Sequence, residues 1–249
     1  MNQPTVVDLR HVSKSYSSGS KTTEVLQNLS LAILRGEFVT VVGASGCGKS
    51  TLLQLIAGLE QPSSGTIDTK AKIAFMFQDA NLLPWLTVRQ NISLALRLAG
   101  VAKTDWAVRV QELIDKVRLT GWEEARPHEL SGGMRHRVAL ARCLAQGAEI
   151  VLMDEPLGAL DAMTRDHLHE EIERISREAQ LTVVFVTHNM REAVRLGDRV
   201  ILMASEPGRI LDEEKVALVR PRVMDSPEVA SLAAKLTGLL KAAGSYEKN

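Results

Sequence analysis

The chain has 249 residues, 45% of them hydrophobic, which is enough to form the core of one domain with a subdomain. Its 30 Lys and Arg balance its 30 Asp and Glu, so the charge argues against nucleic-acid binding and against an electrostatic membrane anchor. The two cysteines, Cys47 and Cys143, indicate reduced thiols in a cytosol. No apolar run approaches the roughly 18 residues of a transmembrane helix, and we expect no signal peptide at residues 1–4.

The first part of the chain has the pattern of a small sheet. Residues 1 to about 35 contain short strand-like segments, at 6–9 and 29–33, that predict an antiparallel sheet. Residues 65–67 could close this sheet. Tyr16 lies between the two segments, in a stretch rich in Ser and Gly.

A glycine-rich segment follows an apolar, strand-like run at 38–42 and opens a helix-like run from Lys49 to about Leu59. Its spacing, G-x-x-x-x-G-K-[ST], is typical of a phosphate-binding P-loop in this context. The glycines let backbone N–H groups converge on phosphate oxygens, and the positive N-terminus of the helix points at the same anion. Lys49 would reach the terminal phosphates, and Ser50 would take one position on Mg²⁺. The segment predicts binding of a nucleoside triphosphate through Gly43, Ala44, Ser45, Gly46, Cys47, Gly48, Lys49, Ser50 and Thr51.

Cys47 stands inside this segment, just before a helix N-terminus and near Lys49. Such a setting lowers the pKa of a thiol and raises its reactivity. We therefore expect a maleimide to label Cys47 and inactivate the protein, and MgATP to protect it.

The middle of the chain is helical. From residue 84 to about 129, apolar residues recur at helical spacing and predict a helical subdomain. A further helix is expected to begin after Ser131 and to run to about Ala145, with Ser131 as its N-cap and with Gly132 and Gly133 leaving the first amides uncovered. This is a second anion site at a helix N-terminus. Because the P-loop already surrounds the phosphates of its own nucleotide, we expect the second site to serve the nucleotide of another subunit.

An acidic pair ends the next predicted strand. The continuous apolar run at 150–153 predicts a strand buried on both faces, and Asp154 and Glu155 follow it. The C-terminal ends of parallel strands form the edge where such sheets bind ligands. Asp154 could hold Mg²⁺ through its water shell, and Glu155 could polarise the attacking water, because phosphoryl transfer needs a positioned nucleophile. Beside a P-loop, this pair predicts hydrolysis of the nucleotide.

The last third of the chain alternates strands and helices. Strand-like runs at 182–186 and 199–203 alternate with helix-like runs at 161–179 and 190–196, as in a parallel sheet. Residues from 226 onward predict a capped amphipathic helix. Its apolar side is most simply packed on its own domain, and the alternative is a contact with a dimer partner or a membrane. Three histidines on predicted helices stand beside charged residues and are expected to face solvent: His136, His167 and His169.

Residues 130–137 resemble the signature of the ATP-binding cassette (ABC) family, L-S-G-G-Q, with Met134 where the family most often has Gln. Three further segments closely resemble the ATPases of nitrate, sulfonate and taurine importers: residues 77–85, 154–165 and 207–210. This resemblance covers nearly the whole chain. Residues 219–222 and the short segment from 65 to 78 look most like the aliphatic-sulfonate branch.

The resemblance implies an α/β fold: a P-loop NTPase parallel-sheet core with an N-terminal antiparallel β subdomain and an inserted α-helical subdomain. It predicts a single ABC ATPase domain over residues 1–249. Within it we expect a core, a helical subdomain that carries the signature, and a C-terminal helix, at residues 1–83 with 146–224, about 84–145, and 225–249.

The resemblance also implies roles for single residues. Gln78 would touch Mg²⁺ and the attacking water and sense a membrane subunit, and His188 would contact the γ-phosphate. Tyr16 would stack on adenine, and Asp161 would lie in the loop, 158–161, that crosses a dimer interface. The partner's ATP would be bound by the signature residues Ser131, Gly132, Gly133 and Met134. The expected cofactors are ATP and Mg²⁺, the metal being held, partly through water, by Ser50, Gln78 and Asp154.

The implied function is that of an ATPase subunit at the cytoplasmic face of the membrane, which energises import of a small solute such as a sulfonate, taurine or nitrate. Two copies, or one copy and a similar ATPase, would enclose two ATP–Mg²⁺ and drive separate permease subunits, served indirectly by an extracytoplasmic solute-binding protein. Residues 84–86 would help line the groove that receives a permease helix, and the alternative is that Trp85 packs within the helical subdomain. The alternatives are the ATPase of an ABC exporter or lipid-trafficking system and, from another class, a non-transport ABC ATPase.

Overall fold

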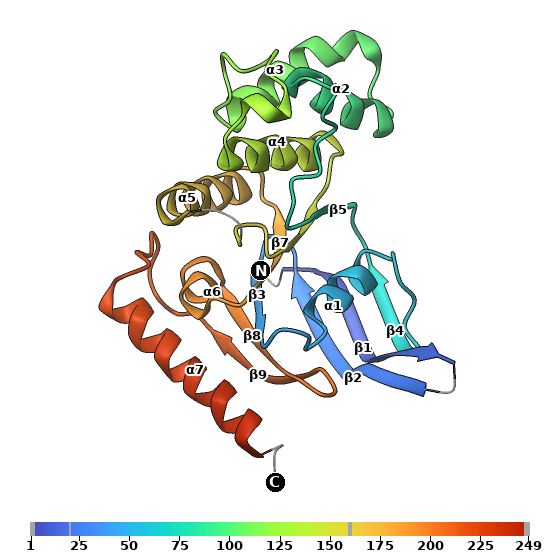
Figure 1. Ribbon diagram of the computed structural model, residues 1–249, viewed down its shortest axis with the longest axis vertical. Coiled ribbons are helices and arrows are strands. Elements are labelled where there is room, and N and C mark those ends of the chain that lie inside the picture. Colours follow the sequence, from blue (N-terminus) through green and yellow to red (C-terminus); the bar gives the residue numbers. More distant parts are fainter. Residues whose placement is uncertain (1–2, 20, 159–160, 247–249) are drawn as a thin grey trace. The chain divides into compact units, whose positions relative to one another are not determined.

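The computed structural model describes residues 3–19, 21–158 and 161–246 (Figure 1). The chain divides into two compact units, Met1–Ala71 with Thr182–Asn249, and Lys72–Leu181. Parallel and antiparallel strands together with helices confirm the predicted α/β class. The finer division into core, helical subdomain and C-terminal helix stays a prediction.

The antiparallel sheet of the first unit has the strand order β2-β1-β4, formed by Lys21–Leu34, Thr5–Ser18 and Ser64–Thr69. β1 and β2 each span 14 residues, far more than the segments expected at 6–9 and 29–33. Their polar ends, where Tyr16 lies opposite Thr23, are exposed and are held by the backbone ladder. A ladder needs no apolar side chains, so the hydrophobic pattern reveals only the buried part of this hairpin.

The other strands of this unit follow the order β7-β3-β8-β9, formed by Thr182–Thr187, Phe38–Gly43, Arg199–Ala204 and Arg209–Lys215. β3 pairs in parallel with β7 and β8. Every residue of β3 and β7 is buried, as expected for strands covered on both faces. β9 pairs antiparallel with β8, where the sequence pattern predicts no strand, because its charged residues 212–214 hide the periodicity.

Among its described residues, the first unit has helices α1 at Lys49–Ile56, α6 at Met190–Leu196 and α7 at Pro227–Tyr246. α7 places Val229, Ala233 and Leu236 in a buried cluster with Val42 and Leu202, so its apolar side packs on its own domain as predicted. Within the ranges that the structure describes, no helix combines the length and the hydropathy needed to cross a bilayer.

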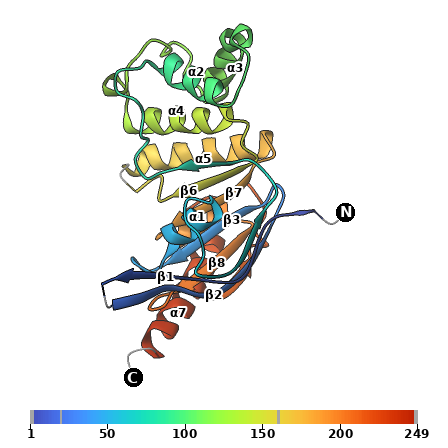
Figure 2. The ribbon, with the colours of Figure 1, turned by 90° about the vertical axis from the view of Figure 1, so that its right-hand side faces the viewer.

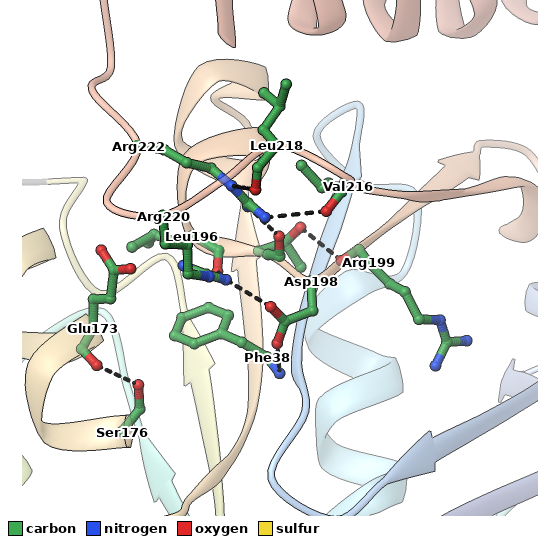
Figure 3. A network of polar contacts seen from close by, with 12 residues as sticks. Phe38, Glu173, Ser176, Leu196, Asp198, Arg199, Val216, Leu218, Arg220 and Arg222 are labelled. Atoms are coloured by element: carbon green, nitrogen blue, oxygen red, sulfur yellow. Dashed lines mark hydrogen bonds and ion pairs between the residues drawn. The ribbon is translucent and has the colours of Figure 1, made fainter. Parts of the chain in front are cut away.

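Arg220 and Arg222, which follow β9 in the chain, cap the C-terminal end of α6 through hydrogen bonds to its carbonyl groups (Figure 3). Arg222 is buried and donates to the backbone carbonyl groups of Val194 (2.8 Å), Arg195 (3.3 Å), Gly197 (2.6 Å), Val216 (3.1 Å) and Leu218 (3.0 Å). Arg220 donates to the carbonyl group of Leu196 and pairs with Asp198 at 2.8 Å. The last carbonyl groups of a helix have no partner within the helix. The two guanidinium groups supply those partners.

The second unit begins with a short strand, β5 (Ile73–Met76), that pairs in parallel with β6 (Ile150–Asp154). Its α-helices α2, α3, α4 and α5 lie at Val88–Leu98, Trp106–Lys116, Gly132–Ala145 and Ala162–Glu178, and its 3-10 helices η1 and η2 at Lys103–Asp105 and Pro127–Glu129. In both views, α4 lies between α5 and the pair formed by α2 and α3 (Figure 2). Both sides of α4 are therefore packed.

The packing corrects the expectation for two of the three histidines. His136 on α4 is only 6% exposed and His169 on α5 is fully buried, whereas His167 is exposed as predicted. Consecutive helix residues point about 100° apart, so a charged neighbour in the sequence occupies a different face. The charged residues next to His136 and His169 in the sequence show that each helix has an exposed face. The two histidines lie on a different, buried face.

Candidate active site

The P-loop connects β3 to α1 in the first unit. Lys49 is the first residue of α1, is only 5% exposed, and donates through Nζ to the carbonyl oxygens of Gly43 and Ala44, each at 2.9 Å. Throughout the part of the chain that the structure describes, no carboxylate pairs with this ammonium group. Burying a charge without a counter-charge is unfavourable. The loop therefore favours an anion beside Lys49.

Glycines give the loop its shape. Gly46 and Gly48 have φ angles of 81° and 91°, a region that side chains with a Cβ adopt only at a cost. A Cβ on Gly43 would lie 2.6 Å from both the Cys47 Sγ and the Met203 carbonyl oxygen. Gly48 is the N-cap of α1, and no side chain caps this end, so first-turn N–H groups stay available. The cradle of amides and the buried ammonium group together fit the phosphates of ATP.

The environment of the Cys47 thiol differs from the one predicted, because the side chain is buried. It is 1% exposed, and this burial raises the pKa of its thiol, outweighing the opposite effect of nearby Lys49. The prediction of a lowered pKa is wrong. The sequence shows that a lysine and a helix N-terminus are near, but it does not show how completely the loop removes the sulfur from water.

His188 emerges at the same edge of the sheet as the P-loop. β3 and β7 are parallel with Val42 opposite Thr187, so Gly43 and His188 follow at the same strand ends. The His188 side chain is exposed there. Asn189, the N-cap of α6, accepts hydrogen bonds from two first-turn N–H groups and so fixes the residue after His188. The predicted contact of His188 with the γ-phosphate stays a prediction.

Tyr16 is partly exposed near the end of β1 in the same unit. The Lys14 Nζ lies 4.8 Å from the centroid of its ring, within cation–π range. The ring is thus held in place by a neighbouring charge. Its stacking on adenine stays a prediction.

The parallel pair in the second unit brings Gln78 together with the acidic residues. Met76 of β5 lies opposite Met153 of β6, so the chain leaves both strands at the same edge, toward Gln78 on one and toward Asp154 and Glu155 on the other. Asp154 and Glu155 are half-buried. Glu155 has a left-handed φ of 43°, a strain of about 1–3 kcal/mol that residues bear chiefly at functional sites.

The predicted signature occupies the start of α4. Ser131 is the N-cap, as expected, and its Oγ accepts from the backbone N–H of Met134 at 3.3 Å. A Cβ on Gly133 would lie 2.7 Å from the Thr164 Cγ2 of α5, so this glycine permits the close approach of two helices. Ser131 is exposed, which leaves room for a ligand from outside the unit.

Asp161 is the N-cap of α5 and accepts from the backbone N–H of Thr164 at 3.0 Å. Ala159 and Leu160, which belong to the same predicted loop, lie outside the described residues. The place of Asp161 at a dimer interface stays a prediction, as does the metal site of Ser50, Gln78 and Asp154.

The contacts of two residues with the loop around Gln78 were not predicted from the sequence. His136 and Arg142 of α4 contact backbone carbonyl groups in the loop that carries Gln78. No motif marks them. The available signal was that His136 stands one helical turn after Gly132, beside the signature.

The family model described as ABC transporter matches residues 26–158, just over half of the chain. The chain is 47% identical over 244 residues to a Burkholderia lata protein named aliphatic sulfonates import ATP-binding protein SsuB 1, which covers 96% of this chain and 73% of the relative. It is 41% identical over 238 residues to a Bacillus cereus protein named aliphatic sulfonates import ATP-binding protein SsuB, with coverage of 92% and 94%.

Solved structures agree with this. A dimer of the ATP-binding cassette MJ0796 bound to ADP and Pi, in a post-hydrolysis state, is 33% identical with a TM-score of 0.73, and covers 86% of this chain and 100% of that one. CbiO1 from Clostridium perfringens, at 24% identity and a TM-score of 0.76 over 85% and 89% of the chains, has the same fold. The resemblance inferred from the sequence is confirmed. The chain belongs to the ABC transporter family, as an ATP-binding cassette that hydrolyses ATP.

Proposed function

We propose that this chain is the ATPase subunit that drives import of a small organic anion of the aliphatic-sulfonate type through separate membrane subunits. The observation that carries the ATPase part is the buried Lys49 ammonium group among the open amides of the P-loop. The import part is supported by the names of relatives that are 41% and 47% identical over most of their length. Taurine and nitrate are the other solutes to test.

Each half of the site has its own task in this proposal. The amides of residues 43–51 and Lys49 bind the phosphates, and Ser50, Gln78 and Asp154 hold Mg²⁺, partly through water. Bound there, the metal neutralises phosphate charge. Glu155 orients and polarises the attacking water, and His188 holds the terminal phosphate.

The protein works as a pair in this proposal. Ser131, Gly132, Gly133 and Met134 contact the ATP held by the partner, and Asp161 lies in the loop between the subunits. Support comes from MJ0796, whose cassette is dimeric. A homodimer is the simplest form of the pair. The pair binds its permease subunits at the cytoplasmic face of the membrane.

The surface proposed for the permease includes Trp85. It is 66% exposed, Pro84 beside it is exposed, and Leu86 is half-buried. A large exposed aromatic side chain is typical of an interaction surface. Because Trp85 and Gln78 share one loop, permease binding there reaches the site of hydrolysis.

A growth test separates the solutes. A strain that lacks this chain should fail to grow when an aliphatic sulfonate is the only sulfur source, and sulfate should restore growth. The intact gene should rescue the strain, and Glu155→Gln should not. Growth on the sulfonate without the gene refutes sulfonate import, and parallel cultures on taurine or nitrate identify either as the solute instead.

A further inference from the structure

The loop between β5 and α2, residues 77–87, carries Gln78 and Trp85 and contains no helix or strand. Its backbone carbonyl groups cannot be satisfied by a regular ladder, so they need other partners. Side chains from two neighbouring helices of the same unit supply several of them: His136, Arg142 and Asn91.

His136 acts at Gln78 itself. Its ring is buried, with Nε2 at 3.1 Å from the Gln78 carbonyl oxygen and Nδ1 at 2.9 Å from the Gly132 carbonyl oxygen. A carbonyl oxygen only accepts, so the Nε2–H tautomer donates to Gln78 alone, and the imidazolium donates to both Gln78 and Gly132. A single planar ring thus spans from the Gln78 backbone to the first turn of the signature helix.

The rest of the loop is held separately. Arg142 donates through Nη1 to the Asn81 carbonyl oxygen at 2.6 Å. Asn91, which is buried, accepts from the Leu83 backbone N–H at 3.0 Å and donates to the carbonyl oxygens of Leu86 (3.2 Å) and Thr87 (3.0 Å). Losing His136 therefore releases the Gln78 end of the loop while the Trp85 end stays fixed.

We propose that His136 is a positioning residue: it holds the Gln78 backbone and couples it to the N-terminus of α4, where Ser131 lies. The inference rests on the proposed role of Gln78 in hydrolysis. A displacement at Gln78 reaches the first turn of the signature helix through this ring, because its two nitrogens lie against the Gln78 and Gly132 carbonyl oxygens. The phosphate-binding residues of the P-loop belong to the other unit, so we expect replacement of His136 to change ATP affinity much less than kcat.

The test compares His136→Leu with His136→Gln in the full-length protein. His136→Leu removes both ring nitrogens, and kcat should fall about tenfold while the affinity for ATP changes less than about twofold. In the nucleotide-free protein, amide hydrogen exchange of residues 77–80 should become faster, with residues 81–87 unchanged. His136→Gln keeps an N–H donor and should recover most of both properties. His136→Phe, which keeps a planar ring without nitrogens, should behave as His136→Leu does.

Glu171→Gln is the matched control. Glu171 is buried on α5 in the same unit and pairs with Arg118 and Arg174, far along the helix from the Asp161 cap. It should lower the melting temperature without changing kcat or exchange in the loop. An equal loss of kcat in Glu171→Gln, a normal kcat and exchange in both His136→Leu and His136→Phe, or no recovery in His136→Gln overturns the proposal. If the wild type binds ATP without hydrolysing it, the proposed function fails, and the exchange measurement still decides whether His136 holds the loop.

Discussion

Two helix N-termini in this protein are predicted to meet ATP, and they are built differently. At α1, the N-cap is Gly48, no side chain caps the helix, and a buried Lys49 ammonium group stands among the free amides. At α4, the Ser131 hydroxyl already accepts from the Met134 N–H, and the guanidinium group of Arg135 in the first turn donates to the Leu130 carbonyl oxygen at 2.7 Å. The first end thus holds a buried cation that no carboxylate of the described residues pairs with, whereas the second has a side-chain cap and an arginine bound to a backbone carbonyl group.

The difference shows which end can bind alone. The α1 end combines the helix dipole with a desolvated positive charge, both of which favour an anion. The α4 end offers the dipole and an exposed hydroxyl, which is a weak site for a free nucleotide. The α4 end contributes to binding only when a partner subunit brings a nucleotide that it already holds. A helix N-terminus of this second kind is suited to completing a site rather than to forming one.

The largest effect should come from a residue outside both helix ends. Replacing Glu155 with Gln keeps the shape of the side chain but weakens its pull on the water proton. Hydrolysis should fall by about 100-fold or more while ATP binding survives, because the α1 end is untouched. ATP should also trap Glu155→Gln as a stable dimer. An ATPase assay measures hydrolysis, an equilibrium binding assay measures ATP affinity, and size-exclusion chromatography detects the dimer. Wild-type turnover in Glu155→Gln would remove this residue from the mechanism.

Heterodimers test directly whether the α4 end completes the partner's site. Lys49→Ala disables the α1 end, and Ser131→Arg places a bulky side chain where the phosphate must approach the α4 end. If each site joins α1 of one chain to α4 of the other, a heterodimer of the two single mutants keeps one intact site. A heterodimer of wild type with the double mutant then has one lesion in each site.

The expected rates are therefore about half of wild type for the pair of single mutants and near background for the wild-type/double-mutant pair. Differently tagged chains, purified as heterodimers with their membrane subunits, allow both to be assayed. If α4 served the ATP of its own chain, the two rates would exchange places. Activity in the wild-type/double-mutant pair alone would contradict the comparison of the two helix ends.

How much of this could be predicted from sequence depends on how local each signal is. The P-loop and the Ser131 cap were predicted correctly because a few consecutive residues specify them. The contacts of His136 and Arg222 with distant carbonyl groups leave no local trace, since they depend on which backbone segments pack nearby. The predicted direction of the Cys47 pKa shift was wrong for the same reason. Desolvation of the thiol depends on the whole fold and not on the neighbouring residues in the sequence.

A smaller effect should separate packing from ligand binding at the α4 end. In Gly133→Ala the new methyl group would meet the Thr164 Cγ2 of α5 at 2.7 Å. Overpacking should lower the free energy of unfolding by about 1–2 kcal/mol, even though alanine favours a helix more than glycine does. Thr164→Ser removes the opposing methyl group, so the double variant should regain stability in chemical denaturation. If it does not, the glycine is not needed for helix packing, and its role lies with the ligand.

The smallest effect is expected at Cys47. Its rate of alkylation measures how accessible the α1 end is to solvent, and the residue has no proposed role in hydrolysis. Burial raises the pKa of this thiol above its ordinary value, so at pH 7 almost none of it is the reactive thiolate. Alkylation of the native protein should be slow at pH 7 and should accelerate as the pH rises toward and beyond that ordinary value. Bound MgATP should slow it further, because the sulfur is reached only when the loop opens.

Cys47→Ala supplies the background for that measurement by mass spectrometry. Its remaining thiol, Cys143, is buried with its pKa raised to about 12, so this variant should take up almost no label. Rapid labelling of Cys47 at pH 7 would mean that the α1 end is open to water in solution. The buried Lys49 would then be solvated as well, and the contrast between the two helix ends would lose its physical basis.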